Sequence, residues 1–426
     1  MKTFKTKVGY FNEEIPIHFV QFSEIISSVK PFFNVSRIFG IPSFSVIENV
    51  VSKGGILTFF GLLNIFLLIN QIFLFVMRLT RGEDFFKISG PFLLMRLHVI
   101  FVHIWCIFYS RKLATALRSS LVVENRINKV YNGKTVEFIP PWLLRRKCLI
   151  WTALFVIVGL GITFKTFPID ILLGQVSAGE AWESYGEMCG LNKELFLLPS
   201  VTSAYCLFME IATNFVWLFG DFFLVILSII MSEMFSRINT RGIKRVDPTH
   251  LTSIEIDLIR EHHGVTAKLV KEFDDAIAAL NLISLVFNVA FLVVGAYSVF
   301  TLKSRERRRM TAALTKLYCK LIVAAIKLAS GLIAASVLHH KAHQAIAEVR
   351  SWPMAREFQD FSINNGRASV IHAFLAQLSK PSIGFTIGKL ATITPKLLAL
   401  TALGVGIFFA FARITISSCS RGSSRS

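Results

Sequence analysis

Long apolar runs separated by short polar segments are the feature that most limits how this chain can fold. Each run holds about 20 residues, enough for a helix to cross a hydrocarbon core of about 30 Å. Seven crossings are expected, near 55–77, 91–110, 148–173, 195–232, 280–302, 317–338 and 383–414. With 53% hydrophobic and only 17% charged residues, the chain is too apolar for an average soluble protein. The sequence therefore predicts an all-α, polytopic membrane protein.

Basic residues set the predicted orientation, because Lys and Arg concentrate in cytoplasmic connections. The connection 111–147 carries nine Lys and Arg residues, whereas the connection 174–194 is acidic. Together they predict an intracellular N-terminus and, after an odd number of crossings, an extracellular C-terminus. The basic segment 303–309 disagrees, since it falls outside in this arrangement. The net charge of +19 does not indicate nucleic-acid binding, because the basic residues flank the crossings.

An amphipathic helix is expected directly before the fifth crossing. Val265, Leu269 and Phe273 recur at helical spacing. We expect this helix to extend crossings four and five below the membrane, the alternative being a membrane-surface helix. The predicted division begins with a cytoplasmic N-terminal segment that holds a surface or interfacial helix (1–54), crossings one to four (55–238) and the cytoplasmic amphipathic helix of an anchor region (239–279). Crossings five and six (280–338), a cytoplasmic anchor segment that is irregular over 352–380 (339–382), the pore-lining last crossing (383–416) and an extracellular tail (417–426) follow.

The last crossing combines a proline with small residues. Pro395 is expected to kink the helix and act as a hinge. Gly404 and Gly406 would let neighbouring helices approach closely. A kinked, closely packed final helix suits a pore, and the alternative is a packing helix that accommodates its proline.

No residue pattern indicates catalysis or a cofactor. The six cysteines show no CxxC spacing, and His339 and His343 share a helical face without a neighbouring carboxylate or cysteine. The sequence therefore predicts no enzyme activity, no metal and no cofactor.

Two stretches carry a resemblance to a known family. Residues 260–294, REHHGVTAKLVKEFDDAIAALNLISLVFNVAFLVV, look like a cytoplasmic helix that runs without a break into the fifth crossing. Near the C-terminus, Phe408 is a near match for the tyrosine of a motif of Thr-Tyr, five apolar residues and Gln-Phe, whose Thr, Gln and Phe are absent. The chain resembles an arthropod gustatory receptor of the insect chemoreceptor superfamily, as a divergent member.

The resemblance implies a ligand-gated, non-selective cation channel that a small-molecule tastant opens. It further implies a homo- or hetero-tetramer in the plasma membrane of a sensory neuron, with monovalent and divalent cations as permeants. Four copies of the last helix would line the pore, and apolar side chains could close it by dewetting. The expected gate residues are Ile407, Phe408, Phe411 and Ile414.

A ligand pocket in the outer half of crossings two to six is also implied. Polar groups within a membrane are costly and tend to face a cavity or pair with each other. Arg96 and Glu210 could form such a buried pair, whereas Asp221 and Glu233 suit the cytoplasmic assembly. The ligand-binding candidates are Arg96, His98, Tyr205, Glu210, Tyr297 and Lys327.

Two other protein classes remain alternatives. A seven-helix G-protein-coupled receptor would place its N-terminus outside, which the basic connection 111–147 opposes. A small-molecule transporter would be expected to show an internal repeat, and none is visible. The sequence does not identify the ligand.

Overall fold

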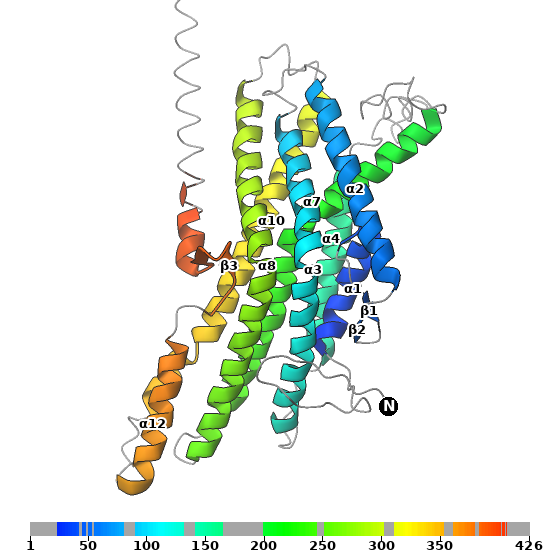
Figure 1. Cartoon of the computed structure of the whole chain (residues 1–426). Coiled ribbons are helices and arrows are strands. Elements are labelled where there is room, and N and C mark those ends of the chain that lie inside the picture. The colour runs from blue at the N-terminus through cyan, green and yellow to red at the C-terminus, as the bar shows by residue number, and fades with distance from the viewer. Residues whose placement is uncertain are drawn as a thin grey trace, which may run out of the picture.

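Long helices run side by side in the computed structural model of the chain and form an elongated bundle (Figure 1). The structure describes residues 24–41, 45–47, 50–52, 55–80, 90–131, 141–164, 199–244, 251–301, 311–352, 361–379, 383–401, 403, 404 and 406. Its helices are α1 (Glu24–Ile38), α2 (Gly55–Thr80), α3 (Gly90–Tyr131), α4 (Pro141–Phe164), α7 (Pro199–Ile238), the π-helical turn η4 (Asn239–Lys244), α8 (Ser253–Thr301), α10 (Thr311–His343), α11 (Ile346–Ser351) and α12 (Phe361–Leu378). Two antiparallel hairpins pair β1 (Ser45–Ile47) with β2 (Val50–Ser52), and β3 (Thr386–Ile387) with β4 (Ala391–Thr392).

Six of the described helices are long and apolar enough to cross a membrane, namely α2, α3, α4, α7, α8 and α10. They coincide with the first six predicted crossings, which confirms the predicted all-α membrane fold. The seventh predicted crossing, 383–414, falls largely outside the described residues. The basic segment 303–309 and the acidic connection 174–194 also lie outside them.

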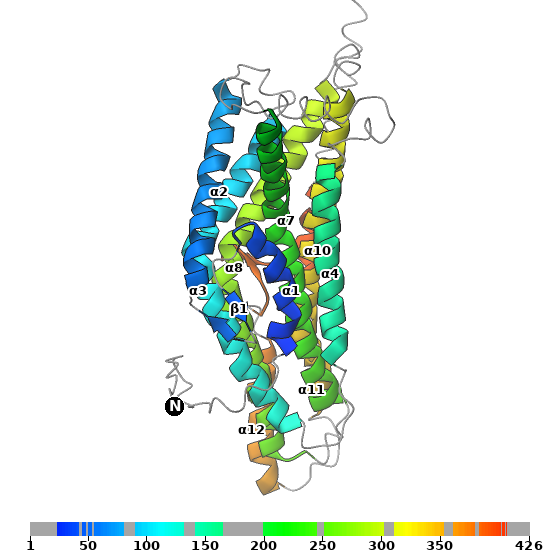
Figure 2. The same cartoon turned by 90° about the vertical axis from the view of Figure 1, so that its right-hand side faces the viewer.

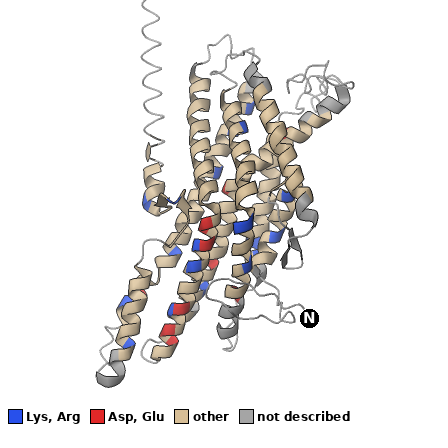
Figure 3. Cartoon of the chain, viewed as in Figure 1, with Lys and Arg blue, Asp and Glu red and all other residues tan. Residues whose placement is uncertain are grey.

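Helix α8 is much longer than a bilayer core is thick. Its 49 residues span about 70 Å, against about 30 Å of hydrocarbon. All its Asp, Glu, Lys and Arg residues lie before Ala276, in the lower half of the helix (Figure 3). The predicted amphipathic helix and the fifth crossing are therefore one continuous helix, and the alternative of a separate membrane-surface helix is wrong.

Helix α3 corrects the predicted connection 111–147. The helix continues past residue 110 to Tyr131 and α4 begins at Pro141, so most of that expected connection is helical. After Pro91 this stretch contains neither glycine nor proline, and Leu113 and Leu117 are fully buried where α3 packs along α8. Five of the nine basic residues thus lie on a helix that prolongs the second crossing, and Arg145, Arg146 and Lys147 lie in the first turns of α4.

Helix α7 forms the centre of the bundle. Its Phe219 stacks on Phe32 of α1, with the ring centroids 5.5 Å apart. The ring centroid of Phe155 on α4 lies 4.9 Å from that of Phe32. Figure 2 shows α1 lying against α7 between α3 and α4. Because Phe32 and Phe33 are fully buried, α1 is a core helix, and the surface or interfacial helix expected here is wrong.

The C-terminal part corrects two further expectations. The stretch expected to be irregular before residue 380 contains helix α12, which packs against α8. The last helix begins only at Pro395, and the Thr394 hydroxyl accepts a hydrogen bond of 3.2 Å from the Leu397 N–H. Thr394 is thus the N-cap and Pro395 the first helical residue, a position that proline fits without distortion. The kink expected at Pro395 is therefore wrong, and a hinge at this position stays a prediction.

Candidate functional site

Polar side chains from four helices meet inside the end of the bundle where α3 and α10 begin. Most are almost fully buried, with Arg96 5% exposed and Lys320 completely enclosed. Ionisable groups within a membrane bundle are costly unless they pair or line a site. We call this group the outer polar cluster, and its members are Gln71, Arg96, Glu210, Thr213, Lys316 and Lys320.

Arg96 joins α3 to α2 and α7. Its Nη1 donates to Gln71 Oε1 at 2.7 Å and to Thr213 Oγ1 at 3.1 Å. Gln71 Nε2 donates to the same hydroxyl at 2.8 Å. This predicted candidate therefore faces the interior and is held in a defined orientation.

Glu210 joins α7 to α10. Its Oε1 lies 3.2 Å from Lys316 Nζ and 3.0 Å from Lys320 Nζ. The sequence suggested Arg96 as its partner and overlooked both lysines, which stand one turn apart on α10. With three cations and a single carboxylate, the cluster has many more hydrogen-bond donors than acceptors. Lys316, at 20% side-chain exposure, is its most accessible charge.

A second buried pair lies deeper in the bundle. Lys327 Nζ is 3.0 Å from Asp221 Oδ2 and donates to the Trp217 carbonyl at 2.7 Å. Asn288 Nδ2 donates to both oxygens of the same carboxylate. Asp221 is therefore part of the bundle core, which corrects its expected place in the cytoplasmic assembly.

The three remaining candidates lie apart from each other. His98 is fully buried and stacks on Phe287 at 5.5 Å. Tyr205 donates a hydrogen bond to Asn70, and Tyr297 is 58% exposed on α8. The structure thus gathers Arg96 and Glu210 into one cluster, and a ligand-binding role for each of these residues stays a prediction.

A short hairpin connects the lower half of α8 to the start of the last helix. Asp274 accepts hydrogen bonds from the Thr386 N–H at 2.6 Å, the Thr386 hydroxyl at 2.8 Å and Lys389 Nζ at 2.6 Å. Asp275 accepts a second bond from Lys389 Nζ at 2.5 Å. We call Asp274, Asp275, Thr386 and Lys389 the hairpin clamp.

Backbone geometry and charge both fix this hairpin. Gly388 has a φ of +57° and its N–H donates to the Ala278 carbonyl at 2.9 Å. A Cβ at Gly388 would lie 2.7 Å from Leu282 Cδ2, so only glycine allows this approach. Burial alone would lower the pKa of Lys389, but the hydrogen bonds and charges of Asp274 and Asp275 raise it above its ordinary value. Lys389 therefore remains charged at neutral pH.

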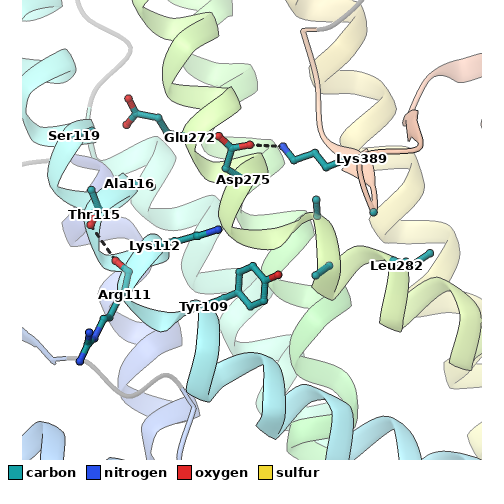
Figure 4. Close-up of a pocket in the computed structure, with 13 residues that line it drawn as sticks. Tyr109, Arg111, Lys112, Thr115, Ala116, Ser119, Glu272, Asp275, Leu282 and Lys389 are labelled. Carbon is teal, nitrogen blue, oxygen red and sulfur yellow. Dashed lines mark hydrogen bonds and ion pairs between the residues drawn. The ribbon is translucent and has the colours of Figure 1, made fainter. Parts of the chain in front are cut away.

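A groove of about 730 Å³ opens beside the clamp, between α3, α8 and the hairpin. Figure 4 shows Lys112 of α3 reaching toward α8, Arg111 turned away, and Asp275 linked to Lys389 across the far wall. The hairpin forms one side of this groove, so a shift of the hairpin relative to α3 would change its shape.

The described start of the last helix lies on the outside of the bundle. Leu400 is 64% exposed and Leu403 60% exposed. A Cβ added to Gly404 or Gly406 would meet no atom of the described residues within 4 Å. The predicted gate residues Ile407, Phe408, Phe411 and Ile414 lie outside the described residues.

Sequence reasoning found the apolar face of α8 but missed the clamp. Asp274 lies off the apolar face that Val265, Leu269 and Phe273 define, yet it is only 3% exposed. Two glycines, Gly384 and Gly388, in the stretch PSIGFTIGK were the available signal, since both adopt positive φ angles.

Comparisons with known proteins add to this geometry. Residues 11–364 match the family model described as "Trehalose receptor". The fold is similar to that of the insect olfactory receptor OR5 from Machilis hrabei, with a TM-score of 0.65 and 12% identity over 91% of this chain and 97% of that one. The same receptor in complex with eugenol gives a TM-score of 0.61 and 12% identity over 93% and 100%. A comparison with curated proteins gives no significant match.

Proposed function

Because the chain belongs to the trehalose receptor family, we propose that it is a gustatory receptor that conducts cations when a small molecule binds. The membership bears out the resemblance to gustatory receptors and the expectation of a multi-pass membrane receptor. The channel mechanism and the ligand are the parts that the proposal adds.

The observation that carries the channel mechanism is the position of the last helix. Its first turns leave the bundle with Leu400 and Leu403 exposed, and no atom of the described residues lies within 4 Å of a Cβ built at Gly404 or Gly406. Small residues on an uncovered apolar helix favour close contact with another helix. A second copy of this helix is the natural partner, and closed symmetry would bring the copies around one axis. We assign the tetramer, its pore and the gate at Ile407, Phe408, Phe411 and Ile414 to this axis.

The outer polar cluster is the proposed ligand site. Its excess of donors suits a ligand rich in oxygen acceptors, and the family's name makes trehalose the first compound to test. Lys316 would reorganise on binding, because it is the accessible member, whereas Glu210 would stay paired with the enclosed Lys320.

The hairpin clamp is the proposed link between ligand and pore. Helix α10 carries Lys316 and Lys320, packs along α8, and α8 holds the clamp at its lower half. A shift of α10 against α8 would therefore reach the start of the last helix through Asp274. In this proposal the hairpin is the bistable element. It would occupy one position on α8 in the closed state of the channel and another in the open state.

The experiment is whole-cell recording from cells that express this chain alone, with G-protein signalling inhibited. We expect trehalose or another polyol to evoke a cation current that persists under inhibition. Lys316→Gln should raise the ligand concentration for half-maximal current, whereas the matched change Lys268→Gln on the lower half of α8 should not. A response that disappears with G-protein inhibition, or a glycosylation site at the C-terminus that is never modified, would contradict the proposal.

A further inference from the structure

A second groove, of about 650 Å³, lies between α4, α7 and α10, away from the outer polar cluster. On α10 its lining changes from the exposed apolar Ile333 and Val337 to Lys341 at the end of the helix. On α4 it changes from Trp151 to Lys147. Because α4 runs opposite to α10, the two lysines come to the same end of the groove.

Helix α7 shows the same gradient. Val225 and Ile229 line the apolar part, and Ser232 and Glu233 follow toward the lysine end. Three helices thus build one groove that is apolar along its length and charged at one end. That polarity matches a phospholipid, which has acyl chains in the hydrocarbon and a charged headgroup at the interface.

Two polar atoms at the charged end have no hydrogen-bond partner within the part of the chain that the structure describes. Glu233 Oε2 is 3.1 Å from Lys147 Nζ, but Glu233 Oε1 is buried and unpaired. The Ser232 hydroxyl is likewise unpaired. Buried polar atoms are normally satisfied, so each orphaned atom suggests a missing partner. A carboxylate oxygen needs a donor, which a headgroup made only of phosphate does not supply.

We propose that this groove binds one phospholipid whose headgroup carries a primary ammonium beside its phosphate, as in phosphatidylethanolamine and phosphatidylserine. The phosphate lies against Lys147 and Lys341, and the ammonium donates to Glu233 Oε1. One acyl chain follows Trp151 and Ile333 toward the middle of the membrane. The basic connection before α4 places this headgroup at the predicted cytoplasmic face.

The test is native mass spectrometry of the purified full chain with four added lipids that share acyl chains. These are phosphatidylethanolamine, phosphatidylserine, phosphatidylglycerol and phosphatidylcholine. We expect phosphatidylethanolamine and phosphatidylserine to be retained about fivefold more than phosphatidylglycerol and phosphatidylcholine. This is the effect of one partly exposed ion pair, here between the lipid ammonium and Glu233. Glu233→Gln should remove the preference for phosphatidylethanolamine over phosphatidylglycerol.

Two lysine variants separate the site from a general lipid coat. Lys341→Ala and Lys147→Ala should each lower retention of phosphatidylethanolamine and phosphatidylserine, and Lys268→Ala, on α8, should not. Melting temperatures without added lipid check that the variants fold. Equal retention of all four lipids would overturn the proposal, as would a preference for phosphatidylglycerol that Glu233→Gln leaves unchanged.

Discussion

The outer polar cluster and the hairpin clamp use the same chemistry in different surroundings. In the cluster, Glu210 and Lys320 are 8% and 0% exposed and tie two crossings together deep in the bundle. In the clamp, Lys389 is 46% exposed and one helix holds a short hairpin. A buried pair cannot lose one partner cheaply, whereas a half-exposed contact can break and re-form. The cluster is therefore suited to hold the bundle and the clamp to move.

Glu210→Ala should have the largest effect, because it leaves the Lys320 amine enclosed in the bundle without its carboxylate partner. Breaking a buried pair costs about 3 to 5 kcal/mol, so we expect a strongly reduced melting temperature in detergent. The double variant Glu210→Gln with Lys320→Met removes both charges and should recover much of that loss. If the single variant melts like the wild type, the cluster does not stabilise the bundle.

Asp274→Asn should separate folding from gating. The change weakens charge-assisted bonds to the Thr386 N–H and to Lys389, worth about 1 to 3 kcal/mol. We expect normal surface expression, but a maximal ligand-evoked current that is reduced at least about fivefold relative to the wild type. An unchanged current with unchanged expression would remove the clamp from the path to the pore.

Gly388→Ala tests the backbone of the same hairpin. Alanine at a φ of +57° costs about 1 to 2 kcal/mol, and its Cβ would press on Leu282. The current should fall in the same direction as for Asp274→Asn. Gly366→Ala is the matched control, since it lies in α12 with no atom within 4 Å of its Cβ and should be neutral.

Asp275→Asn should have the smallest effect. Its carboxylate is 50% exposed and pairs with the 46% exposed Lys389, so its loss is worth about 0 to 1 kcal/mol. The half-maximal ligand concentration should change by less than about fivefold, and less in high salt. An effect as large as that of Asp274→Asn would show that exposure does not distinguish the two carboxylates.

Periodicity predicted what depends on long apolar patterns. The first six crossings follow from their long apolar runs, and the unbroken α8 follows from the helical spacing of residues such as Val265, Leu269 and Phe273. Neither prediction requires knowledge of which residues in the bundle these side chains contact. The family resemblance also rested on α8. These features depend on local spacing, so the sequence contains them directly.

Features that depend on packing were missed. The sequence around Pro395 does not show whether the proline starts a helix or lies within one. The hairpin before it ends at Thr392, and this makes Pro395 the first helical residue. Lys316 and Lys320 were overlooked because their role in the cluster depends on pairing with Glu210, which lies more than 100 residues away in the chain. The burial of α1 likewise depends on packing against Phe219 of α7, which no sequence pattern near α1 predicts.

The most direct test of the central claim is thiol modification of the last helix during recording. In the Gly404→Cys variant, a charged thiol reagent should block the ligand-evoked current, because the copies of this helix line the pore. Gly61→Cys is the control, since Gly61 on α2 has similar open space and should not change the current when modified. A ligand-evoked current that the reagent leaves intact in Gly404→Cys, with labelling verified, would contradict the account.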